Sequence, residues 1–277
     1  PASATSRFWS AHQRFFRLLV TASKLPLLHE TLDRGLAQGK SVVVGLLGTG
    51  EAYGEAAARH ANEATADAVL PCVDLTADDV VPGAACGPGE PALPSAPAAI
   101  LRTTITTVIY PDVPQNDERV AKLLAQIDSL KLPPNPLDAI MARLASEGVE
   151  SVELSGRAEV AALRNTLRER FQLGQARVAV ISDAASTGIS LHAPVPPKGE
   201  PVRPRLHVTL ELNWSADRQI QQLGRTHRTG QACPPEHVLL VSDVGGEQRF
   251  VSTVARRLQS LGALSGDDGV SRDGGVS

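Results

Sequence analysis

The sequence predicts an α/β protein in which helices cover both faces of a parallel β-sheet. Near-continuous apolar runs alternate with amphipathic helical segments, a pattern typical of strands that are buried on both sides. The 277 residues suffice for a sizeable core, and the content of 42% hydrophobic and 21% charged residues is that of a globular protein. Because functional residues of such sheets lie at the carboxyl ends of the strands, a site is expected there.

Two helices are expected in residues 1–40, which we predict to form a helical lead-in packed on the main domain. Apolar residues at helical spacing indicate the first helix between Phe8 and Leu19. Leucines at positions 25, 28, 32 and 36 indicate the second, and Gly39 has the character of its C-terminal cap. The run SVVVGLL at 41–47 then predicts a strand buried on both faces.

Residues 66–100 differ in composition from the rest of the chain. They contain six prolines, nine alanines, three glycines and no Lys or Arg. We interpret them as a disordered, acidic insertion that is dispensable for folding, within a main domain that spans 41–264. Residues 101–110 are interpreted as a strand that directly follows the insertion, and residues 265–277 as a disordered tail.

The second half of the chain contains the regular alternation of helices and strands. Helices are predicted over 120–130 and from Asn135, which is a good N-cap followed by proline at the first helical position. Strands are predicted at the segments 149–154, 178–182, 206–212 and 238–242, each followed by a helix. Such βα units imply a parallel sheet.

Composition and charge limit the classes of function. The net charge of −3 means that any contact with nucleic acid must be local, because domains that bind through bulk electrostatics are usually basic. The three widely spaced cysteines provide neither a disulfide framework nor a CxxC metal site. The sequence contains no run of eighteen apolar residues, so we expect neither a membrane-spanning segment nor a membrane as a partner. Because the chain begins at Pro1, we expect a piece of a longer protein.

Two glycine-rich stretches resemble ligand-binding loops. The stretch 35–41 has the glycines of a phosphate-binding loop one residue too close together and precedes a strand, so a helix C-cap is favoured. The stretch 48–54 follows a strand and could begin a dinucleotide or S-adenosylmethionine site with Asp74 as the ribose partner. We favour a tight strand-to-helix turn there as well.

Residues 178–231 carry the strongest chemical signal. The strand at 178–182 runs into Ser186, Thr187 and Gly188, which supply hydroxyl donors and a close backbone approach to a phosphate. Further on, Gln221, Arg225 and Arg228 have spacings of four and seven residues, which predicts one helical face with an amide and two guanidiniums. Such an array suits the γ-phosphate of a nucleotide. Helix capping and surface salt bridges are the alternatives.

These segments resemble two motifs of superfamily 2 helicases. ISDAASTGISL is similar to their motif V, and QQLGRTHRTGQ is similar to motif VI in its Swi2/Snf2 form. Together with FWSAHQRFFR, GKSVVVGLLGTGEA, LPPNPLDAI and GEQRFVSTVARRLQSLGAL, they identify the chain as a member of the strawberry notch family. The resemblance covers residues 7–264 except 66–100.

The resemblance implies the second RecA-like lobe of an ATP-hydrolysing enzyme that is inactive without its preceding lobe. That lobe would hold ATP and Mg²⁺, while Arg228 would act as the arginine finger with Arg225 beside it and Gln221 and Gly188 near the nucleotide. Ser186 and Thr187 would contact nucleic acid. The expected partners are the preceding lobe, DNA or chromatin, and transcription regulators, and the expected location is the nucleus.

A proline-rich loop is a second candidate contact with DNA. Lys198, Arg203 and Arg205 lie between two predicted strands, and relatives are also basic here; an ordinary solvated loop is the alternative. Three functions remain open: an ATP-driven translocase on DNA, a transcriptional scaffold without ATP turnover, and a Rossmann-type enzyme at the 48–54 loop. The two arginines favour the first.

Overall fold

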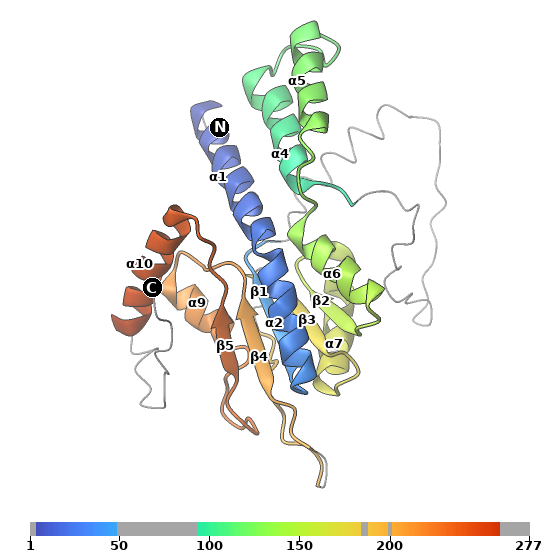
Figure 1. Cartoon of the computed structure of the whole chain (residues 1–277), viewed down its shortest axis with the longest axis vertical. Helices are drawn as coiled ribbons and strands as arrows, with labels where there is room; N and C mark the ends of the chain where they lie inside the picture. The colour runs from blue at the N-terminus through green and yellow to red at the C-terminus, as the bar shows by residue number, and fades with distance from the viewer. Residues whose placement is uncertain (1–3, 49–92, 184–187, 199–200, 261–277) are drawn as a thin grey trace.

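A computed structural model describes residues 4–48, 93–183, 188–198 and 201–260. Its centre is a five-stranded, fully parallel sheet with the strand order β2-β3-β1-β4-β5 (Figure 1). The strands are β1 (Ser41–Leu46), β2 (Ser151–Leu154), β3 (Val178–Ser182), β4 (Arg205–Thr209) and β5 (Glu236–Leu239). The predicted α/β class is therefore confirmed.

The strand β1 organises the sheet because it lies in the middle and is buried along its whole length. Val43 lies opposite Ala179 of β3 on one side and His207 of β4 on the other. The apolar run that predicted this strand thus has neighbours on both edges as well as on both faces. By contrast, β5 is an edge strand with exposed residues, and it begins two residues earlier than predicted.

Helices cover both faces of the sheet. On one face, α2 (Leu25–Ala37) and α6 (Pro136–Ser146) pack on Val42, Val44 and their neighbours in the largest apolar cluster (Figure 1). On the other, α7 (Ala158–Gln172) packs Phe171 against the alternate residues of β1, β2 and β3. The short α9 (Ala216–Leu223) also lies on this second face and packs against α10 (Gly245–Ser260).

A group of helices projects beyond the carboxyl edge of the sheet (Figure 1). It comprises α1 (Ala4–Ser23), α4 (Ala96–Thr104), the π-helix η1 (Ile105–Ile109) and α5 (Glu118–Ser129). Leu18 of α1 packs on Ile100 of α4, and Ile105 packs on Val120 and Ile127 of α5. The two lead-in helices thus have separate roles, since α2 covers the sheet and α1 reaches into the projecting group.

The prediction of a strand at residues 101–110 is wrong, because these residues continue α4 and form η1. The β-branched run TTITTVI favours a strand by propensity. In the structure, threonine hydroxyls donate to carbonyls one turn earlier, with Thr104 to Ile100 and Thr107 to Thr103 both at 2.7 Å. Burial of Ile100 and Ile105 between α1 and α5 overrides the local preference.

The predicted insertion also extends too far at its carboxyl end. Residues 66–92 lie outside the described part of the chain, but Ser95 caps α4 by accepting from the Ala98 amide, and Ala96 and Ile100 are buried. The alanines and prolines here are helix-starting residues rather than linker. The helix that was considered for residues 51–64 and the tail at 265–277 lie outside the described residues.

Local signals for helix ends are confirmed at several positions. Asn135 caps α6 by accepting from the Leu137 amide, and Ser215 caps α9 by accepting from the Arg218 amide. Gly39 has a φ of +76° directly after α2, as expected of a C-terminal cap. Within the described ranges, no helix is long and apolar enough to cross a membrane.

Ile100→Ala should lower the free energy of unfolding by about 2–5 kcal/mol, because it leaves a cavity at a side chain that is 1% exposed. Ile109→Ala is the matched control, since that side chain is 48% exposed and should cost well under half as much. Urea unfolding of both variants tests whether α4 belongs to the core. If both variants lost the same small free energy of unfolding, Ile100 would belong to a linker and not to the core.

Candidate nucleotide site

The site begins where β4 leads into α9. Two buried glutamines fix this helix to the carboxyl edge of the sheet: Gln219 accepts from the Asn213 amide at 2.9 Å, and Gln222 donates to the Leu46 carbonyl at 3.4 Å. Gln222 can approach β1 because residue 45 is glycine, where a Cβ atom would lie 3.0 Å from the Gln222 amide nitrogen. These two glutamines were not singled out from the sequence, although their spacing on the buried side of α9 is a detectable signal.

Gln221, Arg225 and Arg228 do not share one helical face as predicted, because α9 ends at Leu223. Gln221 is exposed in the last turn of the helix. Arg225 follows in a turn and is 8% exposed, whereas Arg228 lies on an exposed loop. The structure therefore gives the two arginines different environments.

The Arg225 guanidinium is buried with incomplete hydrogen bonding. Its Nε has no hydrogen-bond partner within the described residues, although its backbone carbonyl accepts from the Leu191 amide at 2.8 Å. Burial and the neighbouring charge of Arg228 lower the pKa of Arg225, and Asp183 opposes them. Because an unpaired buried donor is costly, this arrangement favours an anion.

Arg228 borders an open depression over the loop that follows α9. Its Nε donates to the Gly224 carbonyl at 3.4 Å, and its amide donates to Gln231 Oε1 at 3.0 Å. The depression is lined by Gly224, His227, Arg228, Thr229, Gly230 and Gln231. Arg225 does not line this depression, but the charge of Arg228 acts on its pKa, so the two guanidiniums lie in the same part of the lobe.

A buried hydroxyl bridge supports the turn that contains Arg225 and leads to Arg228. Thr226 Oγ1 lies 2.9 Å from His207 Nδ1 of β4 and 3.1 Å from His237 Nε2 of β5, and it is 3.1 Å from the Leu223 carbonyl. Burial, followed by the effect of His237, lowers the pKa of His207 to about 3. The ring is therefore neutral at pH 7. Sequence reasoning grouped His207 with the basic loop before it and did not bring these three residues together, since only the sheet register places the two histidines side by side.

The motif after β3 is described only in part. Asp183 accepts from the Asn213 side chain at 3.3 Å, which joins the ends of β3 and β4. Gly188 has a φ of +82°, a backbone conformation that favours glycine. The reason is conformational and not steric, since a Cβ atom there would meet nothing within 4 Å. Ser186 and Thr187 lie outside the described residues.

The prediction that Arg205 contacts DNA is wrong. Its side chain is 2% exposed, lies over the Phe171 ring at 4.7 Å, and donates to the Leu191 carbonyl and to Gln172 Oε1, both at 3.0 Å. It is a structural residue of β4. The sequence placed it in the preceding loop, because the predicted strand began one residue later, at 206.

The loop before β4 also has a different position from the one predicted. Arg203 donates to the Gly174 carbonyl at 3.0 Å, and the Pro204 carbonyl accepts from the Ser41 amide. Both partners precede strands, so this end of the loop lies at the amino edge of the sheet, opposite the edge where the site was expected. Lys198 is exposed. Arg203 therefore does not lie on one DNA-binding surface with Gly188, which follows β3 at the carboxyl edge.

The glycine-rich stretch 35–41 is a helix end, as we favoured. Gly35 lies within α2, and Lys40 precedes β1, where its ammonium pairs with Glu236. The 48–54 stretch and Asp74 lie outside the described residues except for Gly48. Among the residues that the structure describes, no group of His, Cys, Asp and Glu is arranged to hold a metal ion.

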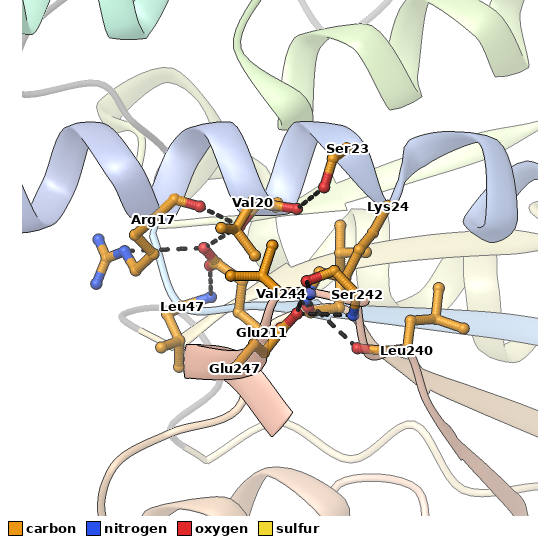
Figure 2. Close-up of polar contacts among 12 residues, drawn as sticks. Arg17, Val20, Ser23, Lys24, Leu47, Glu211, Leu240, Ser242, Val244 and Glu247 are labelled. Atoms are coloured by element: carbon orange, nitrogen blue, oxygen red, sulfur yellow. Dashed lines mark hydrogen bonds and ion pairs between the residues drawn. The ribbon is translucent and has the colours of Figure 1, made fainter. Parts of the chain in front are cut away.

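The carboxyl edge contains a buried charged network that the sequence did not reveal (Figure 2). Lys24, at the junction of α1 and α2, is 3% exposed and pairs with Glu247 of α10 at 2.6 Å. It also donates to the Leu210 and Leu240 carbonyls, which follow β4 and β5. Although burial opposes it, hydrogen bonds from Lys24 and Ser242 lower the pKa of Glu247.

A second carboxylate extends this network (Figure 2). Glu211 accepts from Thr21 Oγ1 at 2.7 Å and from the Leu47 amide at 2.8 Å, and it lies 3.8 Å from Arg17 Nε. The helices α1 and α2 are thereby attached to the edge of the sheet from which α9 begins.

Comparison with known proteins defines the class. A helicase C-terminal family model, described as "C-terminal domain on Strawberry notch homologue", matches residues 140–275. With the parallel sheet, this match defines a helicase C-terminal domain of the strawberry notch type.

The relatives identify the family. The chain is 34% identical over 350 residues to strawberry notch homolog 1 of Rattus norvegicus, covering 96% of this chain and 27% of that protein. It is 32% identical to strawberry notch homolog 2 of Mus musculus, covering 96% of this chain and 26% of that protein. The chain therefore belongs to the strawberry notch family and spans about a quarter of the length of these relatives.

Solved structures show a more distant likeness. The C-terminal part of the Fun30 ATPase domain has 15% identity and a TM-score of 0.36, covering 57% of this chain and 53% of that one. The C-terminal domain of the DEAD-box protein Dbp5 has 18% identity and a TM-score of 0.35, covering 53% of this chain and 82% of that one.

The buried histidine should make stability depend on pH. Because the pKa of His207 is about 3 in the folded chain and about 6.5 when unfolded, the unfolded state binds the extra proton between these values. Stability is thus retained above about pH 6.5 and lost as pH falls, by about 1.4 kcal/mol per unit. His207→Gln should remove this component.

Urea unfolding at pH 6.5 and 4.5 measures the effect. The native chain should lose about 2–3 kcal/mol more over this interval than the His207→Gln variant. His227→Gln is the control, because that histidine is exposed on the neighbouring loop. If the free energy of unfolding changed with pH equally in the native chain and in His207→Gln, the His207 ring would not be buried in its neutral form.

Proposed function

We propose that this chain is the second lobe of an ATP-dependent translocase that acts on DNA. In this proposal a preceding lobe holds ATP and Mg²⁺, and the present lobe contributes Arg225 and Arg228 to the nucleotide. The observation that carries the proposal is the buried Arg225 Nε, which has no hydrogen-bond partner among the described residues, together with a second arginine that borders an open depression.

The phosphates of ATP fit this arrangement. Two neighbouring guanidiniums repel one another, and Asp183 is the acidic group that opposes their effect on Arg225. A γ-phosphate would relieve this repulsion and satisfy the buried donor by charge-assisted hydrogen bonds. During hydrolysis the same groups would stabilise the charge that develops on the phosphate oxygens. Gln221 would border the nucleotide, and Gly188 would let the preceding segment approach it.

Family membership supports the wider context of this proposal. The expected partners are the preceding RecA-like lobe, chromatin and transcription regulators, and the expected location is the nucleus. Ser186 and Thr187 remain candidates for contact with the nucleic-acid backbone. Lys198 and Arg203 are weaker candidates, because the end of their loop that contains Arg203 lies at the amino edge of the sheet.

Arg228→Ala in the full-length protein should lower kcat for DNA-stimulated ATP hydrolysis by about a hundredfold or more while KM for ATP changes little. The reason is that an arginine finger acts mainly on the transition state. Arg218→Ala is a matched control, since Arg218 is exposed on α9 outside the depression. An unchanged kcat in Arg228→Ala would exclude the finger role.

The 277-residue chain alone should hydrolyse no ATP, because Lys40 pairs with Glu236 at the amino end of β1 and cannot serve a phosphate-binding loop there. The measurement is Mg²⁺-dependent phosphate release by the purified chain. Activity that Lys40→Ala abolishes would contradict this expectation and make stretch 35–41 a nucleotide site.

A further inference from the structure

We propose that Thr226 is a positioning residue of this lobe. Its buried hydroxyl accepts hydrogen bonds from the rings of His207 and His237, and it thereby fixes the turn from which the Arg225 guanidinium projects. The inference rests on the proposed function, because it concerns the delivery of Arg225 to the phosphates of ATP. It goes beyond that function by naming a neutral side chain that would act only through the arginine beside it.

The first observation is the burial of Thr226 in a loop that is otherwise largely open to solvent. Residues 227–230 are exposed, whereas Thr226 is 0% exposed. Its side chain points to the sheet, since Oγ1 lies 2.9 Å from His207 Nδ1 of β4 and 3.1 Å from His237 Nε2 of β5. Thr226 is therefore the side chain through which this turn is attached to β4 and β5.

The second observation is the direction of the hydrogen bonds at this hydroxyl. Its single proton is donated to the Leu223 carbonyl at 3.1 Å, so both histidines must donate to its lone pairs. His207 is neutral at pH 7, because burial lowers its pKa to about 3, and it therefore carries one ring proton. That proton belongs on Nδ1, since Nε2 is buried and has no hydrogen-bond partner within the described residues. His237 correspondingly donates from Nε2. The hydroxyl is thus held from three directions.

The third observation is the short path from this hydroxyl to the guanidinium. Arg225 directly precedes Thr226, and its backbone carbonyl accepts from the Leu191 amide at 2.8 Å. The backbone of Arg225 is thus held by the loop after β3 on one side and by Thr226 on the other. Its Nε has no hydrogen-bond partner among the described residues, so the backbone of the turn, and not a bond at Nε, decides where this donor lies.

Removal of the hydroxyl should therefore displace the guanidinium. Thr226→Val changes the shape of the side chain little, but it leaves the ring N–H groups of both histidines without their acceptor. Because unpaired buried donors are costly, the turn should move away from the sheet and let water reach them. Arg225 should move with the turn, and a misplacement of about 1 Å in a catalytic site can cost about 100-fold in rate.

The first measurement follows the guanidinium without any nucleotide, by NMR of the nitrogen-15-labelled 277-residue chain. The Nε–H signal of Arg225 is the one lost in Arg225→Ala, and its exchange with water should be slow because the group is buried. Thr226→Val should speed this exchange at least about tenfold, and Thr226→Ser, which keeps the hydroxyl, should stay within about threefold of the native rate. The histidine spectra should show the ring protons on Nδ1 of His207 and Nε2 of His237.

The second measurement is ATP hydrolysis by the full-length protein. Thr226→Val should lower kcat about tenfold or more and change KM for ATP less than about threefold, while Thr226→Ser keeps most of the native kcat. Thr31→Val is the matched control, because Thr31 is 8% exposed and its hydroxyl donates to the Leu27 carbonyl at 2.8 Å in α2, on the opposite face of the sheet. It should lower the urea midpoint but leave kcat and the exchange of Arg225 unchanged.

Three results would overturn the proposal. They are slow Arg225 exchange in a folded Thr226→Val chain, equal effects of Thr31→Val and Thr226→Val on kcat, and a His207 ring with its proton on Nε2. If Thr226→Val does not fold, His237→Phe takes its place, since it removes one donor at an exposed position of the edge strand β5. It should also speed the exchange of Arg225, and a native exchange rate in this variant contradicts the proposal.

Failure of the proposed function is distinguishable from failure of this inference. If Arg225→Ala and Arg228→Ala leave ATP hydrolysis unchanged but Thr226→Val exposes the Arg225 guanidinium to exchange, the nucleotide proposal fails and the control of Arg225 by Thr226 stands. If Arg228→Ala lowers kcat while Thr226→Val leaves both kcat and the exchange of Arg225 at their native values, the nucleotide proposal stands and the positioning role of Thr226 is refuted.

Discussion

The buried ammonium of Lys24 is the constraint on which the arrangement of this lobe depends. A lysine that is 3% exposed must be paired, because an uncompensated charge inside a protein is strongly destabilising. Its partners are Glu247 and the carbonyls that follow β4 and β5. One side chain thus connects the α1–α2 junction with two strands and α10. Glu211, which follows β4, likewise connects Thr21 of α1 with the Leu47 amide after β1.

This network lies at the same edge of the sheet as the candidate nucleotide site. Thr21 in the last turn of α1 and Lys24, which follows the helix, are attached to the carboxyl edge of the sheet. The same edge leads through β4 into α9 and the arginine-bearing turn. A displacement of α9 relative to β4 would therefore act on Glu211, which follows β4, and through it on α1.

The arginine-bearing turn has a support of its own on the second face of the sheet. Thr226 lies against the two neighbouring histidines of β4 and β5, and Gln222 lies over Gly45 of β1. These contacts place polar groups where the other strands have apolar residues. Since buried polar groups are tolerated only when they are hydrogen-bonded, the turn has little freedom to move without breaking them. Arg225 is held in the same turn, with its donor directed to a position that the described residues leave unfilled.

The sequence alone determined the parallel sheet, most helices, their caps and the family, because these depend on local periodicity, on Asn135, Ser215 and Gly39, and on contiguous motifs. It also located the chemically distinctive segment 178–231. Tertiary structure decided the rest. Packing against α1 and α5 turned the β-branched run at 101–110 into a helix. The end of α9 at Leu223 left both arginines outside the helix, Arg225 buried and Arg228 exposed. Burial of Arg205, Lys24 and His207 follows from partners that lie far away in the chain, and no pattern along the sequence contains that information.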